Sequence, residues 1–467
     1  GVALAGLLGL AGLGAQLLIV TASDDARLVF WAYLTVGLPA MFVGYFLLGV
    51  PVGLLVARAL GPAVARGMRV PRTMLVNQAR ATPYRRGFTA GALMVGLAMM
   101  TSIWTNGNAV LRDWLDAIQF PDAFVHGWFG LSAESREKIA ALDFVEETCA
   151  ITLYKIDSGA FGLSEIRPPP TYFVAFEPGP FFRMTRLHWV AGDEAYARRR
   201  LEEGGAVLVA KEFLVKREGY RIGDQFVVEH AGERHEFEIV GAVSSPGLDV
   251  VAFAFDIGKE YANQAISSVF GTRADLERVF GNDSVQMVQV GLKGEISDEE
   301  AERRLREAVD DPAAVVGSGR EIKAQVTGIG RSTMRVASAV AVGAMLIGCL
   351  GVGNIVLAGI DARRFEFGVL RAVGADAWTV GRLVLAEVLL TALTACVLGT
   401  GLGVQGSLAA VRMHELLAGI ELRVRPPVGP IALGWVILIG LTVAVSWPMV
   451  ARLVRRTPRE LLGATRG

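Results

Sequence analysis

Four charged side chains stand close together between two apolar runs, at Arg363, Arg364, Glu366 and Arg371. A charge held in lipid costs about 2.5 kcal/mol or more, so such groups lie in water, pair with each other or contact another protein. Charged groups on a short helix can also give a protein partner a fixed register. The stretch therefore predicts a docking surface. The simpler alternative is a basic loop that only sets membrane topology.

One more charged residue, Glu387, lies inside an apolar run. Intramembrane carboxylates face a bundle interior or a cavity and often mark proton or substrate paths. Two interpretations are open at this point. Glu387 is either a proton or substrate site, or a carboxylate that packs helices near the membrane edge, about one turn beyond Arg382.

The elements that hold these charges are long apolar segments. The chain is 52% hydrophobic and 20% charged, and a bilayer core requires about 20 apolar residues per helix. Six runs meet that length, which predicts an integral membrane protein with a bundle of six transmembrane helices. The runs are Val2–Val20, Val29–Ala57, Gly87–Leu111, Val336–Ile360, Leu383–Val411 and Pro426–Ala451.

Arginine placement predicts the orientation of the bundle. Residues 58–86 carry seven arginines and no acid, and further arginines follow in residues 361–382 and in the tail after 451. Basic short loops stay in the cytoplasm, so we expect both ends of this chain there. We then expect the following divisions: two linking helices at 1–60, a cytoplasmic basic segment with a possible membrane-surface helix at 61–86, a third helix at 87–111, an extracytoplasmic domain at 112–335, and three helices with a cytoplasmic tail at 336–467.

The long segment between the third and fourth helices reads as an α+β domain. Gln225–His230 and Arg234–Val240 alternate apolar and polar residues around Ala231-Gly232-Glu233, which predicts a β-hairpin. Ser297 and Glu300 form a capping box for a helix through Ala308. We also expect a strand at 285–292 and a helix at 132–142, while Pro168-Pro169-Pro170 indicates a stiff extended connection.

The charged stretch itself predicts a short helix and a turn. Phe365, Val369 and Ala372 fall on one helical face. Gly374 suits the left-handed position that ends a helix, and Asp376 suits the cap of the next one. We expect residues 361–378 to act as a coupling segment.

The sequence contains no motif for nucleotide binding, metal binding or hydrolysis. A phosphate-binding Gly-x-x-x-x-Gly-Lys-Ser/Thr loop does not occur, the five histidines show no metal-ligand spacing, and no hydrolase motif is found. Net charge is zero, which gives no argument for nucleic acid. We therefore expect no catalytic residues, no cofactor and no metal in this chain.

The segment RRFEFGVLRAVGA at 363–375 resembles the signature of the FtsX-like permease family, the membrane subunits of ABC transporters of the macrolide-efflux and lipoprotein-release type. The likeness continues through LVLAE at 383–387, the glycines Gly399, Gly401 and Gly403, and the closing stretches WPMVAR at 447–452 and TPRELL at 457–462. Residues 70–467 resemble one full permease unit, whose entry helix corresponds to 70–80 with Pro71 at its first turn.

The resemblance implies a function and partners. Arg363, Arg364, Glu366, Arg371 and Gly374 would form the surface that couples to an ATP-binding subunit, expected as a dimer, which hydrolyses ATP in place of this chain. Motion would pass to the extracytoplasmic domain and export or release a lipid, lipoprotein, peptide or drug by mechanotransmission. A glutamate at the position of Glu387 also occurs in the family, which favours its packing role.

The two extra helices at 1–60 resemble the pair that joins two permease units in ten-helix members. Because the chain starts at Gly1 without methionine, we expect it to be the C-terminal half of such a protein, with its partner an upstream permease half or a second copy. A signal peptide in the first run is the alternative. Membrane lipids and an extracytoplasmic protein or lipoprotein are further expected partners.

Two other functions stay open from the sequence. One is an ATP-driven regulator of an extracytoplasmic cell-wall hydrolase, or a sensor scaffold, as the family resemblance permits. The other is a proton-coupled secondary transporter that uses Glu387 as a relay.

Overall fold

The computed structural model describes residues 1–115, 121–127, 130–156, 171–210, 220–244, 268–294, 296–309, 311–418 and 422–462. The chain divides into two compact units. One consists of Gly1–Ala109, Ser332–Arg412 and Arg423–Gly467, and the other of Val110–Arg331 with Met413–Leu422. We refer to them as the helical unit and the sheet unit. The expected proline stretch at 168–170 lies outside the described residues.

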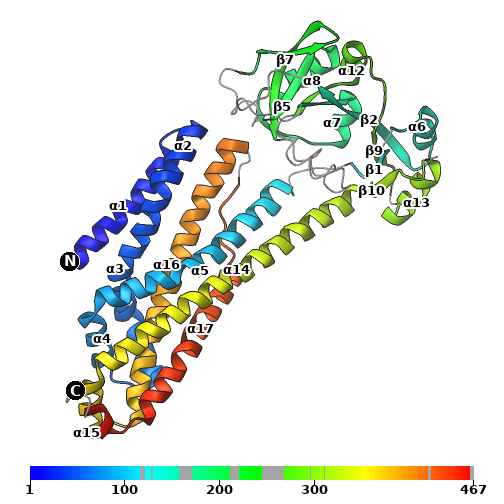
Figure 1. Ribbon diagram of the computed structural model, residues 1–467. Helices are drawn as coiled ribbons and strands as arrows, with labels where there is room; N and C mark the ends of the chain where they lie inside the picture. Colours follow the sequence, from blue (N-terminus) through cyan, green and yellow to red (C-terminus); the bar gives the residue numbers. More distant parts are fainter. Residues whose placement is uncertain are drawn as a thin grey trace. The chain divides into compact units, whose positions relative to one another are not determined.

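Long helices form the helical unit (Figure 1). Among the described residues, six are long and apolar enough to cross a membrane, which agrees with the six predicted runs. The protein is a membrane protein. In chain order the helices are α1 (Val2–Thr21), α2 (Ala26–Ala32), a π-helical turn (Tyr33–Gly37), α3 (Leu38–Met68), α4 (Arg72–Ala81), α5 (Pro83–Ala109), α14 (Gly319–Ala362), α15 (Arg364–Ala372), α16 (Ala377–Ala418), α17 (Val428–Arg455) and α18 (Pro458–Leu462).

Helix bounds differ from the predicted apolar runs by several residues, and for three helices the difference has an identifiable reason. The α3 helix continues past the apolar run to Met68, because helix-forming alanines and arginines follow Ala57. The α14 helix begins at Gly319, well before the apolar run, because the Ser318 hydroxyl accepts a hydrogen bond from the Glu321 amide at 3.0 Å and caps its first turn. The helix expected within 61–86 is α4, but Pro71 precedes it as the N-cap residue and Arg72 is its first residue.

Close helix packing in this unit depends on small residues. Gly49 of α3 faces Gly87 of α5, where a Cβ on Gly49 would lie 2.4 Å from the Gly87 carbonyl oxygen. Small residues let membrane helices approach until their backbones touch. The shared core draws its buried side chains from α3, α5, α14, α16 and α17, among them Met41, Leu97, Met345, Cys396 and Leu438.

The sheet unit holds a ten-stranded mixed sheet of order β10-β1-β9-β2-β3-β8-β5-β7-β4, with β6 paired to β7. Its β3–β8 and β5–β7 pairs are parallel and the others antiparallel. The strands are β1 (Ala123–His126), β2 (Val145–Ile156), β3 (Thr171–Phe176), β4 (His188–Ala191), β5 (Ala206–Ala210), β6 (Gln225–His230), β7 (Glu233–Ser244), β8 (Ser268–Thr272), β9 (Met287–Leu292) and β10 (Val315–Ser318).

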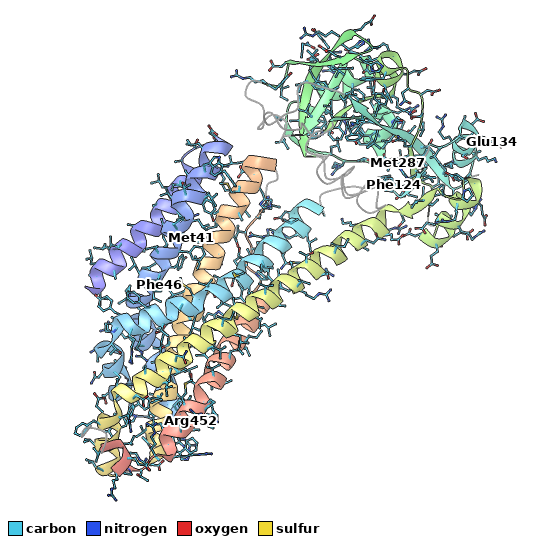
Figure 2. All side chains as sticks on the ribbon, in the orientation of Figure 1. Met41, Phe46, Phe124, Glu134, Met287 and Arg452 are labelled. Carbon is cyan, nitrogen blue, oxygen red and sulfur yellow. The ribbon has the colours of Figure 1, made fainter. Side chains whose placement is uncertain are left out.

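Among its described residues, this unit also has a second π-helical turn (Val110–Leu115) and the short helices α6 (Ala133–Ala140), α7 (Pro178–Met184), α8 (Glu194–Glu203), α12 (Arg273–Phe280) and α13 (Asp298–Ala308). The predicted α+β domain, its hairpin, its helix after Ser297 and the strand within 285–292 are confirmed. The hairpin turn holds positive φ angles at Ala231 and Gly232, as a two-residue type I′ turn requires. Phe124 and Met287 lie on neighbouring strands and belong to one buried core (Figure 2).

Candidate functional site

The turn that follows α15 is a complete Schellman motif. The Ala375 amide donates to the Leu370 carbonyl at 3.0 Å, and the Gly374 amide donates to the Arg371 carbonyl at 3.2 Å. Gly374 has φ +106°, which strains any L side chain. Asp376 then accepts a hydrogen bond at 3.2 Å from the backbone amide two residues on, and α16 begins. The predicted end of one helix at Gly374 and the start of the next after Asp376 are confirmed. We call residues 361–378 the elbow.

The inner side of the elbow packs against α18. Phe367 is buried, and a Cβ on Gly368 would lie 2.9 Å from Leu462. Phe367 shares a buried cluster with Leu461 and with side chains from the adjoining ends of α14, α16 and α17. These contacts hold α15 at one end of the helical unit (Figure 1).

The outer side of the elbow carries an exposed apolar strip. Phe365, Val369 and Val373 are 55%, 41% and 85% exposed, and we call these three residues the outer strip. Glu366 and Ala372 lie beside them and are exposed too. Burying one such apolar side chain is worth about 1.5–3 kcal/mol. The predicted apolar face is therefore the face that the rest of the described chain leaves in contact with solvent.

Two of the elbow arginines bind the C-terminal tail. Arg364 donates to the Glu460 carbonyl at 3.4 Å, and Arg371 donates to the Arg456 carbonyl. Arg456 in turn lies 3.4 Å from a carboxylate oxygen of Asp361. The guanidinium groups predicted for a protein partner thus also fix the elbow to the last helices of this chain.

The third elbow arginine, Arg363, pairs with Glu387. Its two terminal nitrogens donate to the two carboxylate oxygens at 3.0 and 2.9 Å, and the side chains are 18% and 13% exposed. The Arg363 guanidinium also lies 5.2 Å from the centre of the Phe367 ring. The structure thus brings together two residues that the sequence analysis treated separately.

The same glutamate ties α5 to α16 through its backbone. Arg86 and Thr391 both donate to the Glu387 carbonyl, at 3.2 and 3.0 Å. Because one guanidinium occupies both carboxylate oxygens, the geometry is that of an ion pair that joins helices. It favours the packing interpretation of Glu387 over the proton relay.

Sequence reasoning missed a buried polar network between α1, α3 and α16. The Gln405 amide donates to Gln16 at 2.7 Å and to the Leu13 carbonyl at 3.2 Å, and the Tyr45 hydroxyl donates to Gln405 at 3.0 Å. Interhelical hydrogen bonds of this kind stabilise membrane bundles by about 0.6–2 kcal/mol each. Single glutamines in apolar runs give the only sequence signal for it.

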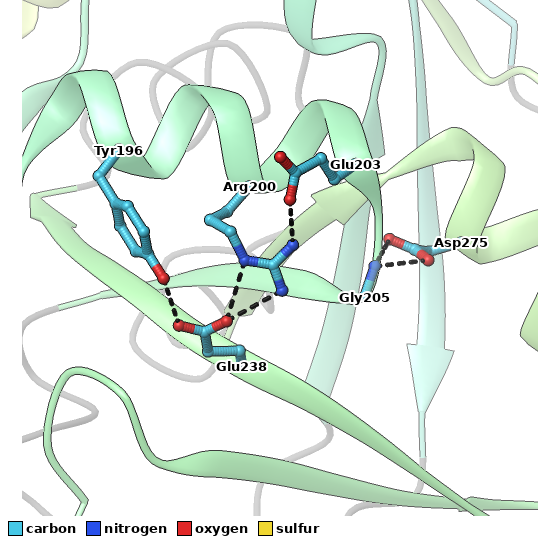
Figure 3. A network of polar contacts seen from close by, with 6 residues as sticks. All are labelled: Tyr196, Arg200, Glu203, Gly205, Glu238 and Asp275. Carbon is cyan, nitrogen blue, oxygen red and sulfur yellow. Dashed lines mark hydrogen bonds and ion pairs between the residues drawn. The ribbon is translucent and has the colours of Figure 1, made fainter.

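The sheet unit has its own polar network (Figure 3). Glu238 on β7 accepts from the Tyr196 hydroxyl at 2.9 Å and from Arg200 at 2.9 and 3.1 Å, and Arg200 also donates to Glu203 at 2.8 Å. The two carboxylates raise the pKa of Arg200 above its ordinary value. These bonds fix α8 on β7.

A cavity of about 740 Å³ opens beside this network, between α7, α8 and α12. The buried Asp275 lines it and accepts a hydrogen bond from the Gly205 amide at 3.0 Å (Figure 3). It also accepts one from the Thr272 hydroxyl at 2.8 Å. Glu177 and Arg273 contribute charges of opposite sign to its wall. This mixture does not select one class of ligand.

The elbow and the helices that flank it are similar to a known permease domain. Residues 338–458 match the model of the FtsX-like permease C-terminal domain. This match confirms the resemblance over these residues. It covers the elbow, Glu387, the larger part of α14, and all of α16 and α17.

One curated relative and two solved structures are each similar to part of this chain. The macrolide export ATP-binding/permease protein MacB of Rhodopseudomonas palustris (strain BisB18) is 31% identical over 133 residues, which is 27% of this chain and 19% of that protein. The chain thus matches about a fifth of the length of this relative. The extracellular domain of the noncanonic ABC-type transporter YknZ from Gram-positive bacteria has a TM-score of 0.29 at 12% identity, with 42% of this chain and 98% of that chain covered. The periplasmic region of MacB from Actinobacillus actinomycetemcomitans has a TM-score of 0.29 at 9% identity, with 46% and 97% covered.

Proposed function

We propose that the chain is the permease part of an ABC-type export complex and that its outer strip docks on a separate ATP-hydrolysing subunit. The observation that carries the proposal is the exposure of Phe365, Val369 and Val373 on a helix whose other side is packed. Exposed apolar residues with a charged neighbour, here Glu366, are typical of a protein interface. The match of residues 338–458 to an FtsX-like permease domain supports the same proposal.

The elbow has contacts suited to passing force into the bundle. A push on α15 would reach α18 through Phe367, and α16 through the pair of Arg363 with Glu387. The α14 helix runs without interruption from Gly319 to Ala362, so the chain itself connects the end of β10 to the elbow. We propose that motion is transmitted along this path to the sheet unit.

We also propose a membrane orientation and a class of cargo. With the arginine-rich segments in the cytoplasm, the elbow and both ends of this chain face the cytoplasm and the sheet unit lies outside. There it would release or expel a lipid, lipoprotein, peptide or drug. ATP would be bound and hydrolysed by the partner, a dimer of ATP-binding subunits.

A docking experiment tests the proposal. The double variant F365S/V369S removes two apolar side chains that are 55% and 41% exposed, so the melting temperature should stay within about 2 °C of the wild type. Affinity for the purified ATP-binding subunit should fall by on the order of 100-fold, the loss of about 1.5 kcal/mol for each side chain. Stimulation of ATP hydrolysis in liposomes should fall with it.

The matched control is V428S at the first residue of α17, where the side chain is 80% exposed at the end of that helix remote from Arg455. It should leave both affinity and ATP hydrolysis unchanged. A folded F365S/V369S protein with wild-type affinity would refute the docking surface.

A further inference from the structure

A second cavity, separate from the elbow, lies between α1, α3 and α4. Its volume is about 340 Å³. Six apolar residues and two arginines line it, and they are Val2, Pro51, Leu54, Leu55, Ala57, Val76, Arg58 and Arg80. The apolar side chains come mostly from the last part of the second predicted membrane run, whereas Arg58 is the first charge after that run.

The two arginines reach the cavity from different helices. Arg58 belongs to α3 and Arg80 to the last turn of α4. Both are exposed, and within the described parts of the chain neither has a hydrogen-bond or ion-pair partner. Between residues 58 and 86 the sequence has seven arginines and no carboxylate. The segment therefore carries an excess of positive charge that its own acids do not balance.

This arrangement fits one kind of molecule. Guanidinium groups bind phosphate oxygens through paired hydrogen bonds, and an apolar wall one turn away suits an acyl chain. Leu55 is 61% exposed on that wall. A free inorganic phosphate would use the arginines but not the apolar wall, whereas a neutral lipid would use the wall but leave the arginines uncompensated.

We propose that this cavity binds one anionic phospholipid, with its phosphate between Arg58 and Arg80 and an acyl chain along Leu54 and Leu55. The lipid joins α4 to the membrane end of α3. It is independent of the docking surface on the elbow, since the two sites share no residue.

Native mass spectrometry of the purified chain in detergent tests the proposal, with phosphatidylglycerol, phosphatidylcholine and inorganic phosphate as probes. The wild type should retain one phosphatidylglycerol in preference to phosphatidylcholine. In R58Q/R80Q the apparent affinity for that molecule should fall on the order of 30-fold, because each arginine near an anionic headgroup contributes about a factor of five. L55W places a larger side chain in the space beside the apolar wall and keeps both arginines, so it should also reduce retention of phosphatidylglycerol.

The matched control is R66Q/R72Q, which removes two exposed arginines of the same segment that do not line the cavity. It should retain the lipid as the wild type does. Equal losses in both double variants would assign the effect to general surface charge and overturn the site. Equal retention of phosphatidylcholine, or displacement of the lipid by millimolar inorganic phosphate with L55W unaffected, would overturn the phospholipid assignment as well.

Discussion

Removing the carboxylate of Glu387 should destabilise the helical unit strongly. In E387Q the side chain keeps its size and loses its charge, and Arg363, whose side chain is 18% exposed, then holds an uncompensated guanidinium between α14 and α16. Removing one member of a buried ion pair costs about 3–5 kcal/mol. The pair is slightly exposed, so we expect about 3 kcal/mol, at the lower end of that range.

A double-mutant cycle separates this cost from loss of packing. The neutral double variant R363Q/E387Q removes both charges and allows an amide–amide hydrogen bond, so it should be less destabilised than E387Q alone. The coupling free energy should be about 2 kcal/mol or more in magnitude. The assay is the free energy of unfolding by steric trapping in bicelles, with melting temperature in detergent as a second readout.

Two outcomes would refute the reasoning. If E387Q were as stable as the wild type, the pair would contribute nothing to the fold. If the destabilisations of R363Q and E387Q simply added in the double variant, the two residues would act independently, in contradiction to their 2.9 Å and 3.0 Å contacts.

Three other changes have clear expected results. G374A should lower the free energy of unfolding by about 1–2 kcal/mol, because Gly374 has φ +106°, a backbone angle that strains any L residue. The new Cβ would meet no atom within 4 Å, so strain is the only cost. The control is G440A inside α17, where the space is equally open and the substitution should be neutral or slightly stabilising. G49A should lower the melting temperature more than either, because its Cβ would meet the Gly87 carbonyl at 2.4 Å, and a variant as stable as the wild type would contradict the α3–α5 contact. Burial lowers the pKa of His126 below its ordinary 6.5, so the stability that the neutral ring contributes is present above pH 6.5 and is lost as pH falls through the folded-state pKa. Hydrogen exchange of β1 in the whole chain, corrected for intrinsic rates, should therefore quicken between pH 6.5 and 5, and H126Q should remove that dependence.

Local patterns in the sequence were enough to predict some of the elements, namely the membrane helices, the β6–β7 hairpin, β9, α6, α13 and α15, but not the other strands of the sheet. The six apolar runs, the alternating strands around Ala231 and Gly232, and the cap at Ser297 each depend on residues that are near one another in the sequence. They can therefore be recognised without knowledge of the tertiary structure. The stop at Gly374 was predictable for the same reason, since only glycine suits its backbone angle.

Contacts between distant segments were not predictable. Arg363 and Glu387 lie 24 residues apart on either side of a turn, and Gln405 and Gln16 are separated by 389 residues. Their pairing depends on how the helices pack, which periodicity does not specify. Periodicity likewise grouped Phe365 with Val369 but gave no sign that Leu461 would cover the opposite side of α15.

Site-specific photo-crosslinking tests the central claim most directly. Benzoyl-phenylalanine at position 365 of the assembled complex should give a covalent adduct with the ATP-binding subunit, identified by mass spectrometry, while the same residue at position 428 should give none. An adduct at 428, or no adduct at 365 in a complex that hydrolyses ATP, would contradict the account.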